Sequence, residues 1–89
     1  MSIERIEAPR HVCGYLQITD LSTAQPLPGN VIDLQAEDGT IRFRLDGVAP
    51  TATVGMLIPE GETRRILVGE NTLQIISGDG ATASVHRYR

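Results

Sequence analysis

Cysteine is almost absent from this chain of 89 residues. Its one cysteine, Cys13, cannot form an internal disulfide, and no paired Cys/His spacing predicts a structural zinc site. A chain of 9.6 kDa also buries only a thin core. Domains of this size usually gain stability from cross-links such as disulfides and bound metal ions, or from neighbouring molecules. Because the sequence offers neither a disulfide nor a structural metal site, we expect one domain that associates with other subunits.

Lysine and tryptophan are missing altogether, and basic charge is scarce. The formal net charge is −3, and the only aromatic residues are Tyr15, Phe43 and Tyr88. A generic nucleic-acid binder needs a basic field and several stacking platforms, so we expect no nucleic-acid partner. All eight cationic residues are arginines. Arginine favours planar, bidentate pairing and is enriched at interfaces, although codon usage in a GC-rich genome would produce the same bias.

Long hydrophobic runs are also lacking. No stretch approaches the roughly 18 consecutive apolar residues that span a bilayer. The first ten residues carry Glu4, Arg5, Glu7 and Arg10 where a signal peptide would be apolar. We therefore expect a soluble protein that is not secreted through a cleaved peptide and has no membrane partner.

The residues that are abundant favour β-structure. Val, Ile, Thr, Tyr and Phe fit a pleated, half-buried surface, and short turn sequences rich in Gly, Pro, Asn and Asp separate them. No segment shows a long helical stripe. Seven strands are predicted, at residues 10–18, 30–35, 40–45, 53–58, 63–68, 72–77 and 82–88. This pattern predicts an all-β fold, a small antiparallel β-sandwich or jelly-roll-like barrel.

Residues 1–9 are interpreted as an N-terminal arm and residues 10–89 as the single domain. The arm carries Ile3 and Ile6 among charges and ends at Pro9. If extended, it reaches on the order of 25 Å, enough to cross onto another subunit. A single helical turn and a frayed terminus are the alternatives.

Alternation along the strands predicts which side chains are buried, because successive residues point to opposite faces of a sheet. One such set is Ile41, Phe43 and Leu45, a second is Val54, Met56 and Ile58, and a third is Leu73 and Ile75. In the second set, Gly55 on the opposite face indicates a place where a side chain does not fit. In the third, Ile76 on the opposite face is expected to be partly exposed or to lie against a neighbour.

Few residues offer reactive chemistry. His11 and Cys13 share one face of the first predicted strand, but no helix is predicted there to activate a thiol. A metal site made from His11, Cys13 and His86 would need two distant strands to meet. The sequence Ser77-Gly78-Asp79-Gly80 predicts a hairpin turn, not a phosphate loop. We expect no enzyme activity, no metal and no cofactor.

The arginines are the strongest candidates for function, and two interpretations remain open. They form ordinary surface ion pairs with Asp33, Asp46 and the glutamates, or they bind carboxylates of a partner subunit through bidentate hydrogen bonds. The residues predicted to contact a partner are Ile3, Ile6, Arg42, Arg44, Arg64, Arg65, Arg87, Tyr88 and Arg89.

Residues 35–89 resemble small structural proteins encoded among the virion genes of tailed bacteriophages. The shared features are an aromatic residue between arginines (Arg42-Phe43-Arg44), an Asp46-Gly47 turn, Val54-Gly55-Met56, a Gly61-Glu62 turn and an end of the form Val-x-x-Tyr-Arg at Val85 to Arg89. The resemblance implies a non-enzymatic virion protein assembled in the bacterial host cytoplasm. A capsid decoration, or cement, protein is the most specific role it implies. Its partners would be the major capsid protein or another virion protein and further copies of itself, as a dimer or trimer.

Two alternatives stay open. A component of the head-tail junction, tail or fibre would have the same composition and would differ in copy number. A glycan-binding β-sandwich module would need exposed aromatic platforms, and three aromatic residues supply few of them.

Overall fold

The computed structural model describes residues 12–88, with only the backbone described at residues 12 and 13. Within this range the chain forms eight strands, and no helix in it is long and apolar enough to cross a membrane. The strands are β1 (Val12–Ile18), β2 (Gln25–Leu27), β3 (Val31–Glu37), β4 (Ile41–Arg44), β5 (Met56–Ile58), β6 (Thr63–Leu67), β7 (Leu73–Ile76) and β8 (Thr82–Tyr88). The predicted all-β sandwich is confirmed. The predicted arm at residues 1–9 lies outside the described residues.

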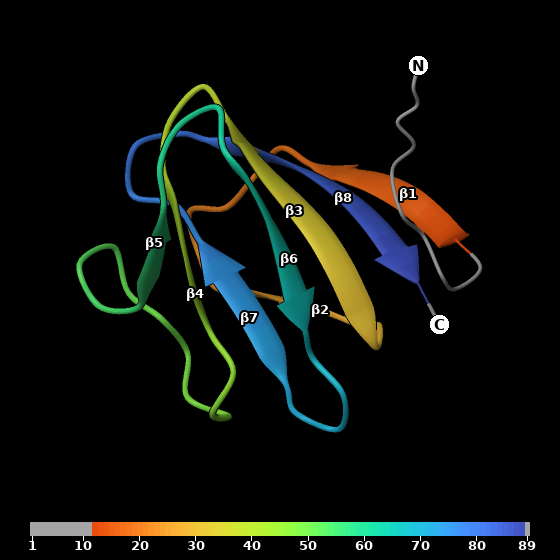
Figure 1. Cartoon of the computed structure of the whole chain (residues 1–89). Helices are drawn as coiled ribbons and strands as arrows, with labels where there is room; N and C mark the ends of the chain where they lie inside the picture. The colour runs from red at the N-terminus through yellow and green to blue at the C-terminus, as the bar shows by residue number, and fades with distance from the viewer. Residues whose placement is uncertain (1–11, 89) are drawn as a thin grey trace, which may run out of the picture.

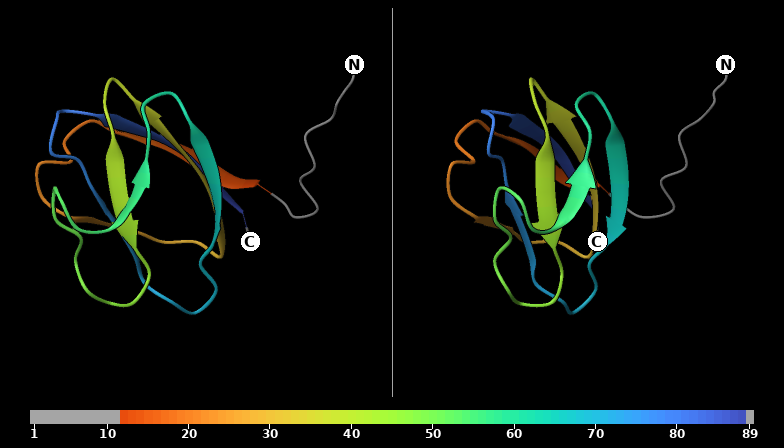
Figure 2. Two further views of the ribbon diagram at one scale, coloured as in Figure 1. Left: turned by 60° about the vertical axis from the view of Figure 1, so that its left-hand side comes forward. Right: turned by 90° about the vertical axis from the view of Figure 1, so that its left-hand side faces the viewer.

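The strands form two antiparallel sheets of four strands each (Figure 1). Sheet 1 has the order β1-β8-β3-β6, and sheet 2 has the order β2-β7-β4-β5. Only β4 and β5 follow each other along the chain within one sheet; every other connection carries the chain from one sheet to the other. Figure 2 shows how this path wraps the two sheets around a common interior.

The core lies between the two sheets. On β3, Ile32, Leu34 and Ala36 alternate inward and are fully buried. Ile41 and Ile75 meet them from sheet 2, also with no exposed surface. Strict alternation on β3 therefore places one complete face in the core, as the period of two requires.

The predicted buried sets of sheet 2 are confirmed for β7 and in part for β4. Leu73 and Ile75 are buried and Ile76 is half-buried, as expected. Phe43 and Leu45 are only partly buried, although both pack against the core, whereas Ile41 is fully buried. The start of β4 therefore lies in the core, whereas its end and the following Leu45 lie nearer the surface.

One strand was missed because it contains Pro26 and is followed by Pro28. Strand β2 pairs with β7 through Pro26, opposite Gln74, and buries Leu27 opposite Leu73. Proline lacks a backbone N–H, so it is tolerated only where no ladder hydrogen bond is needed. Because β2 is the outer strand of sheet 2, Pro26 can occupy it.

The segment Ser77 to Gly80 does not form the predicted hairpin. It carries the chain from β7 in sheet 2 to β8 in sheet 1, so these two strands do not pair. The Asp79 carboxylate accepts hydrogen bonds from the Ser77 hydroxyl (2.8 Å) and from the backbone N–H of Thr40 (3.1 Å). The Ser77 hydroxyl bond, followed by the Thr40 N–H bond, lowers the pKa of Asp79. Asp79 thus fastens the connection between β7 and β8 to the turn between β3 and β4.

Candidate protein interface

Strands β5 and β6 end the two sheets on the same side of the sandwich. Each is the last strand of its sheet, and the turn at residues 59–62 joins them. No other strand among residues 12–88 covers their outer edges. An uncovered edge presents unpaired N–H and C=O groups, and another chain can pair with it.

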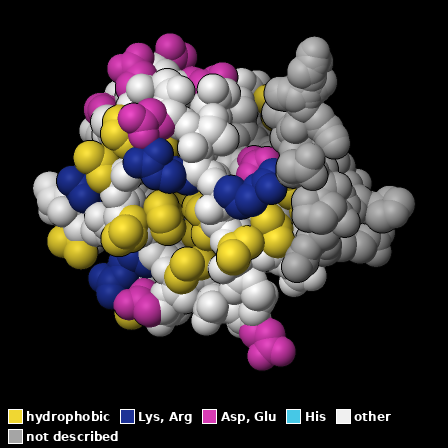
Figure 3. Space-filling model, in the orientation of Figure 1, with side chains coloured by type: hydrophobic (Ala, Val, Ile, Leu, Met, Phe, Trp, Pro, Cys, Tyr) yellow, Lys and Arg dark blue, Asp and Glu magenta, His cyan; other side chains and the backbone are white. Residues whose placement is uncertain are grey.

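Exposed hydrophobic side chains gather on this side. Five of the six large hydrophobic residues that are exposed in the described chain belong to the loop after β4, to β5 or to β6: Val48, Val54, Met56, Leu57 and Leu67. We call these five residues the β5–β6 face. In Figure 3 a band of hydrophobic side chains crosses this side of the molecule, with arginine and acidic side chains above and below it. An apolar centre with a charged rim is the usual composition of a protein–protein interface.

The prediction that Val54 and Met56 are buried is wrong. Met56 lies opposite Phe43 in the β4–β5 ladder, but 65% of it is exposed, and Val54 precedes the strand and is half exposed. Only Ile58 is buried, opposite Ile41. Alternation places Met56 on the inner side of β5, but β5 has no neighbour beyond it that would cover the side chain.

Arg42 lies on the outer face of β4 and holds the loop that leads to β5. Its guanidinium donates hydrogen bonds to the carbonyl oxygens of Ala52 (3.1 Å) and Gly55 (2.9 Å). A Cβ atom at Gly55 would lie 3.1 Å from the Phe43 carbonyl oxygen and 3.2 Å from the Arg42 Cβ, so the expected absence of space at this glycine is confirmed. Arg42 therefore positions Val54 and Met56 through the loop.

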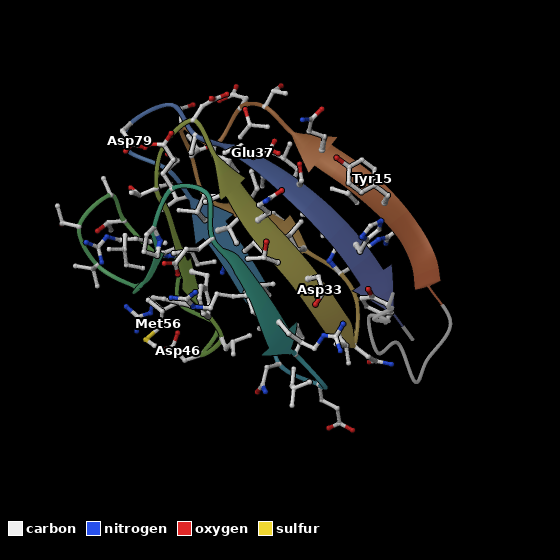
Figure 4. All side chains as sticks on the ribbon, turned by 45° about the horizontal axis from the view of Figure 1, so that its top comes forward. Tyr15, Asp33, Glu37, Asp46, Met56 and Asp79 are labelled. Carbon is white, nitrogen blue, oxygen red and sulfur yellow. The ribbon has the colours of Figure 1, made fainter. Side chains whose placement is uncertain are left out.

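Arg44 and Arg64 form ion pairs with carboxylates two residues away. Arg44 donates two hydrogen bonds to Asp46, one of them 3.0 Å long, and Arg64 binds Glu62. The Arg44 pair lowers the pKa of Asp46. Arg44 and Asp46, together with Val54 and Met56, line a shallow hollow of about 360 Å³, and Figure 4 shows Asp46 and Met56 at this corner.

Arg65 forms a bidentate pair across two strands of sheet 1. Its guanidinium binds both carboxylate oxygens of Asp33, at 2.8 and 2.9 Å, and lies 5.2 Å from the centre of the Tyr88 ring. The Tyr88 hydroxyl donates a hydrogen bond of 2.8 Å to the same carboxylate. The Arg65 hydrogen bond is the main reason that the pKa of Asp33 is lowered, and burial raises the pKa of Tyr88.

The structure brings only part of the predicted contact set together. Arg44 lies beside Val54 and Met56, Arg64 and Arg65 lie on β6, and all three form the intramolecular ion pairs of the first interpretation. Tyr88 is buried, with its hydroxyl bound to Asp33. Arg87 lies opposite Gly14 of β1, away from this face. Ile3, Ile6 and Arg89 lie outside the described residues. Sequence reasoning missed Leu57 and Leu67 as candidate contact residues, because their exposure follows from the edge positions of β5 and β6.

Reactive residues are sparse in the described chain. Residues 12–88, as far as their side chains are described, hold no group of three or more His, Cys, Asp and Glu residues that could bind a metal ion. His11 and the side chain of Cys13 lie outside the description.

Comparison with known proteins returns no relative: no family model, no curated protein and no solved structure matches the chain.

Proposed function

We propose that this protein is a non-enzymatic structural component of a bacteriophage virion, and specifically a capsid decoration protein that binds and stabilises the head shell as an oligomer. The observation that carries the proposal is the β5–β6 face, an exposed apolar surface at two open sheet edges with fixed arginines around it. The setting in a virion depends on the resemblance of residues 35–89 to phage structural proteins.

The strand order supports this assignment. The chain pairs β1 with β8, β2 with β7, β3 with β6 and β4 with β5, as if one long hairpin had been wrapped into a sandwich. This is the arrangement of a jelly roll, which occurs in viral capsid and lectin domains. A fold alone does not determine function, so the support is secondary to the surface itself.

The small size of the domain supports it further. A small core of Ile, Leu, Val and Ala without disulfides gives limited stability. Binding to a shell would stabilise the folded domain by mass action. The apolar residues supply the area that becomes buried, while the arginine pairs keep the surrounding surface polar before assembly.

Copy number tests the role. Quantitative mass spectrometry of purified virions is expected to give an abundance comparable to that of the major shell protein. A number of copies that matches a single ring would favour the alternative of a junction or tail component, and absence from virions would refute both.

Site-directed variants test the surface. We expect Met56→Glu and Leu67→Glu to bind purified shells at least about tenfold more weakly, because loss of a central anchor costs about 2 kcal/mol or more. Gln17→Glu, an exposed change on β1, is the matched control and should bind normally. Normal binding of both β5–β6 variants, with unchanged unfolding curves, would exclude this face as the attachment surface.

A further inference from the structure

The outer face of sheet 1 carries a polar hollow that lies outside the proposed attachment surface. Register places its outward side chains in two rows across the sheet. The first row contains Tyr15, His86, Asp33 and Arg65, and the second contains Gln17, Ser84, Gln35 and Thr63. Between these rows lies a shallow hollow of about 280 Å³.

Tyr15 forms one wall of this hollow and is held in place although it is 56% exposed. Its hydroxyl donates a hydrogen bond of 3.2 Å to the Ser84 hydroxyl, and its ring lies 5.1 Å from the ring of His86. Figure 4 shows Tyr15, Asp33 and Glu37 on the same face of the sheet. A fixed, exposed aromatic ring offers contact area at little cost in conformational entropy.

The floor and the opposite wall are polar. The Ser84 hydroxyl donates a hydrogen bond of 3.0 Å to Glu37, so Tyr15, Ser84 and Glu37 form a chain across three strands. Gln35 and Thr63 also line the hollow and offer both donors and acceptors. These groups lie on strands, which position them more firmly than loops would.

We propose that this hollow binds a neutral saccharide ring, with one face of the sugar stacked on Tyr15 and its hydroxyl groups hydrogen-bonded to Glu37, Gln35 and Ser84. Sugar hydroxyls both donate and accept hydrogen bonds, and the polar groups of the hollow do the same. The volume lies just below the range of about 300–1,000 Å³ for small-molecule sites, so it suits one ring of a longer glycan.

Charge argues for a neutral ligand. An anion would face two carboxylates, Asp33 and Glu37. A cation would find Asp33 already bound by the Arg65 guanidinium at 2.8 and 2.9 Å and Glu37 engaged by Ser84. A polyhydroxylated ring needs no net charge at the site. This proposal does not depend on the proposed role in the virion.

The experiment is a titration of the full chain, labelled with ¹⁵N, with glucose, galactose, mannose and N-acetylglucosamine, followed by NMR. The sugars are raised about tenfold above a millimolar Kd. At least one of them is expected to shift the amide signals of Tyr15, Gln35, Ser84 and His86 in a saturable way. Failure of all four, or shifts confined to β5 and β6, would overturn the proposal.

Variants separate stacking from hydrogen bonding. Tyr15→Ala should weaken binding about tenfold or more, and Tyr15→Phe, which keeps the ring, should weaken it much less. Glu37→Gln should weaken it about tenfold. Gln74→Ala, on sheet 2, is the control and should bind as the original chain does. Equal binding by Tyr15→Ala, or saturable binding of tetramethylammonium in place of the sugars, would refute the saccharide site.

Discussion

Replacing Gly39 with alanine tests how firmly the connection between β7 and β8 is held against the turn between β3 and β4. Gly39 has a φ of +152°, a conformation that side chains rarely adopt. A Cβ atom there would lie 2.5 Å from Oδ1 of Asp79 and 3.2 Å from the Cβ of Ala81. Both contacts belong to the connection between β7 and β8. The substitution must therefore strain the backbone and also push Asp79 away from its place beside Thr40.

The two costs can be estimated separately. Backbone strain of this kind costs about 1–3 kcal/mol, and forcing an atom into occupied space costs about another 1–3 kcal/mol. A domain of this length has a total stability of about 4–13 kcal/mol. Each kcal/mol lowers the Tm of so small a domain by about 4–8 °C. The Gly39→Ala variant should thus lose a large share of its stability.

Gly29 is the matched control because its φ, +140°, is similar. A Cβ atom there would lie 3.3 Å from Cγ1 of Ile32 and 3.7 Å from the Cβ of Arg87, so its contacts are much less severe than the 2.5 Å contact at Gly39. Gly29→Ala should therefore cost mainly the backbone strain of about 1–3 kcal/mol. The assay is urea unfolding followed by circular dichroism. Equal losses in the Gly29 and Gly39 variants would refute the steric part of this reasoning.

A second background keeps the test decisive if Gly39→Ala does not fold. Asp79→Ala removes the carboxylate that the new Cβ would strike, together with its hydrogen bonds to Ser77 and Thr40. We expect Gly39→Ala to cost less in the Asp79→Ala protein than in the original one. The same cost in both would show that Asp79 does not occupy the space above Gly39.

Four further substitutions, one of them a control, test the core, the ion pair and the loop. Leu34→Ala should lower the free energy of unfolding by about 2–5 kcal/mol in urea, and Leu57→Ala by less than about 0.5 kcal/mol, because Leu34 is fully buried and Leu57 is exposed. Asp33 has a lowered pKa in the folded state, so its pair with Arg65 contributes its full stabilisation above the usual pKa of 3.8. That stabilisation is lost as the pH falls through the lowered pKa. Asp33→Asn should therefore flatten the acid side of the stability–pH profile. Arg42→Ala should speed hydrogen exchange in the loop at residues 45–55 more than elsewhere in the chain, and unchanged exchange would exclude its role in holding the loop.

Local patterns predicted most strand positions. The last strand was expected at residues 82–88 and spans Thr82–Tyr88, and the strand expected at 63–68 spans Thr63–Leu67. Turn residues and alternation act over a few neighbours, so sequence alone contains this information. Strand β2 is the exception, because Pro26 and Pro28 also fit a turn and only its pairing with β7 makes it a strand.

Strand pairing could not be predicted in the same way. The segment Ser77 to Gly80 has the composition of a hairpin turn, yet the hydrogen bonds of Asp79 direct it across to the other sheet. Whether a turn joins two paired strands or two sheets depends on contacts with residues about 40 positions away, such as Thr40. Those contacts form only when the whole sandwich is assembled.

Burial depth was also beyond the local pattern. Met56 and Ile58 have the same alternation and the same strand, yet Met56 is 65% exposed and Ile58 is fully buried. Alternation tells which side of a sheet a residue faces, whereas depth depends on how many neighbouring strands cover it. Candidate interfaces at sheet edges are therefore hidden in the sequence among residues that look like core.

The arginines give the clearest division between what spacing can and cannot predict. Arg44 with Asp46, and Arg64 with Glu62, are two residues apart, with each carboxylate just outside the strand that carries its arginine, so short spacing along the chain brings each pair within reach. Arg65 with Asp33 needs β3 and β6 to be neighbours, which only the fold provides. All three arginines already have a carboxylate partner within the chain, which offsets part of the charge that they can offer to another protein. In the proposed attachment, the binding energy at the β5–β6 face is expected to come mainly from Met56 and its apolar neighbours, with the arginine pairs restricting which partners fit.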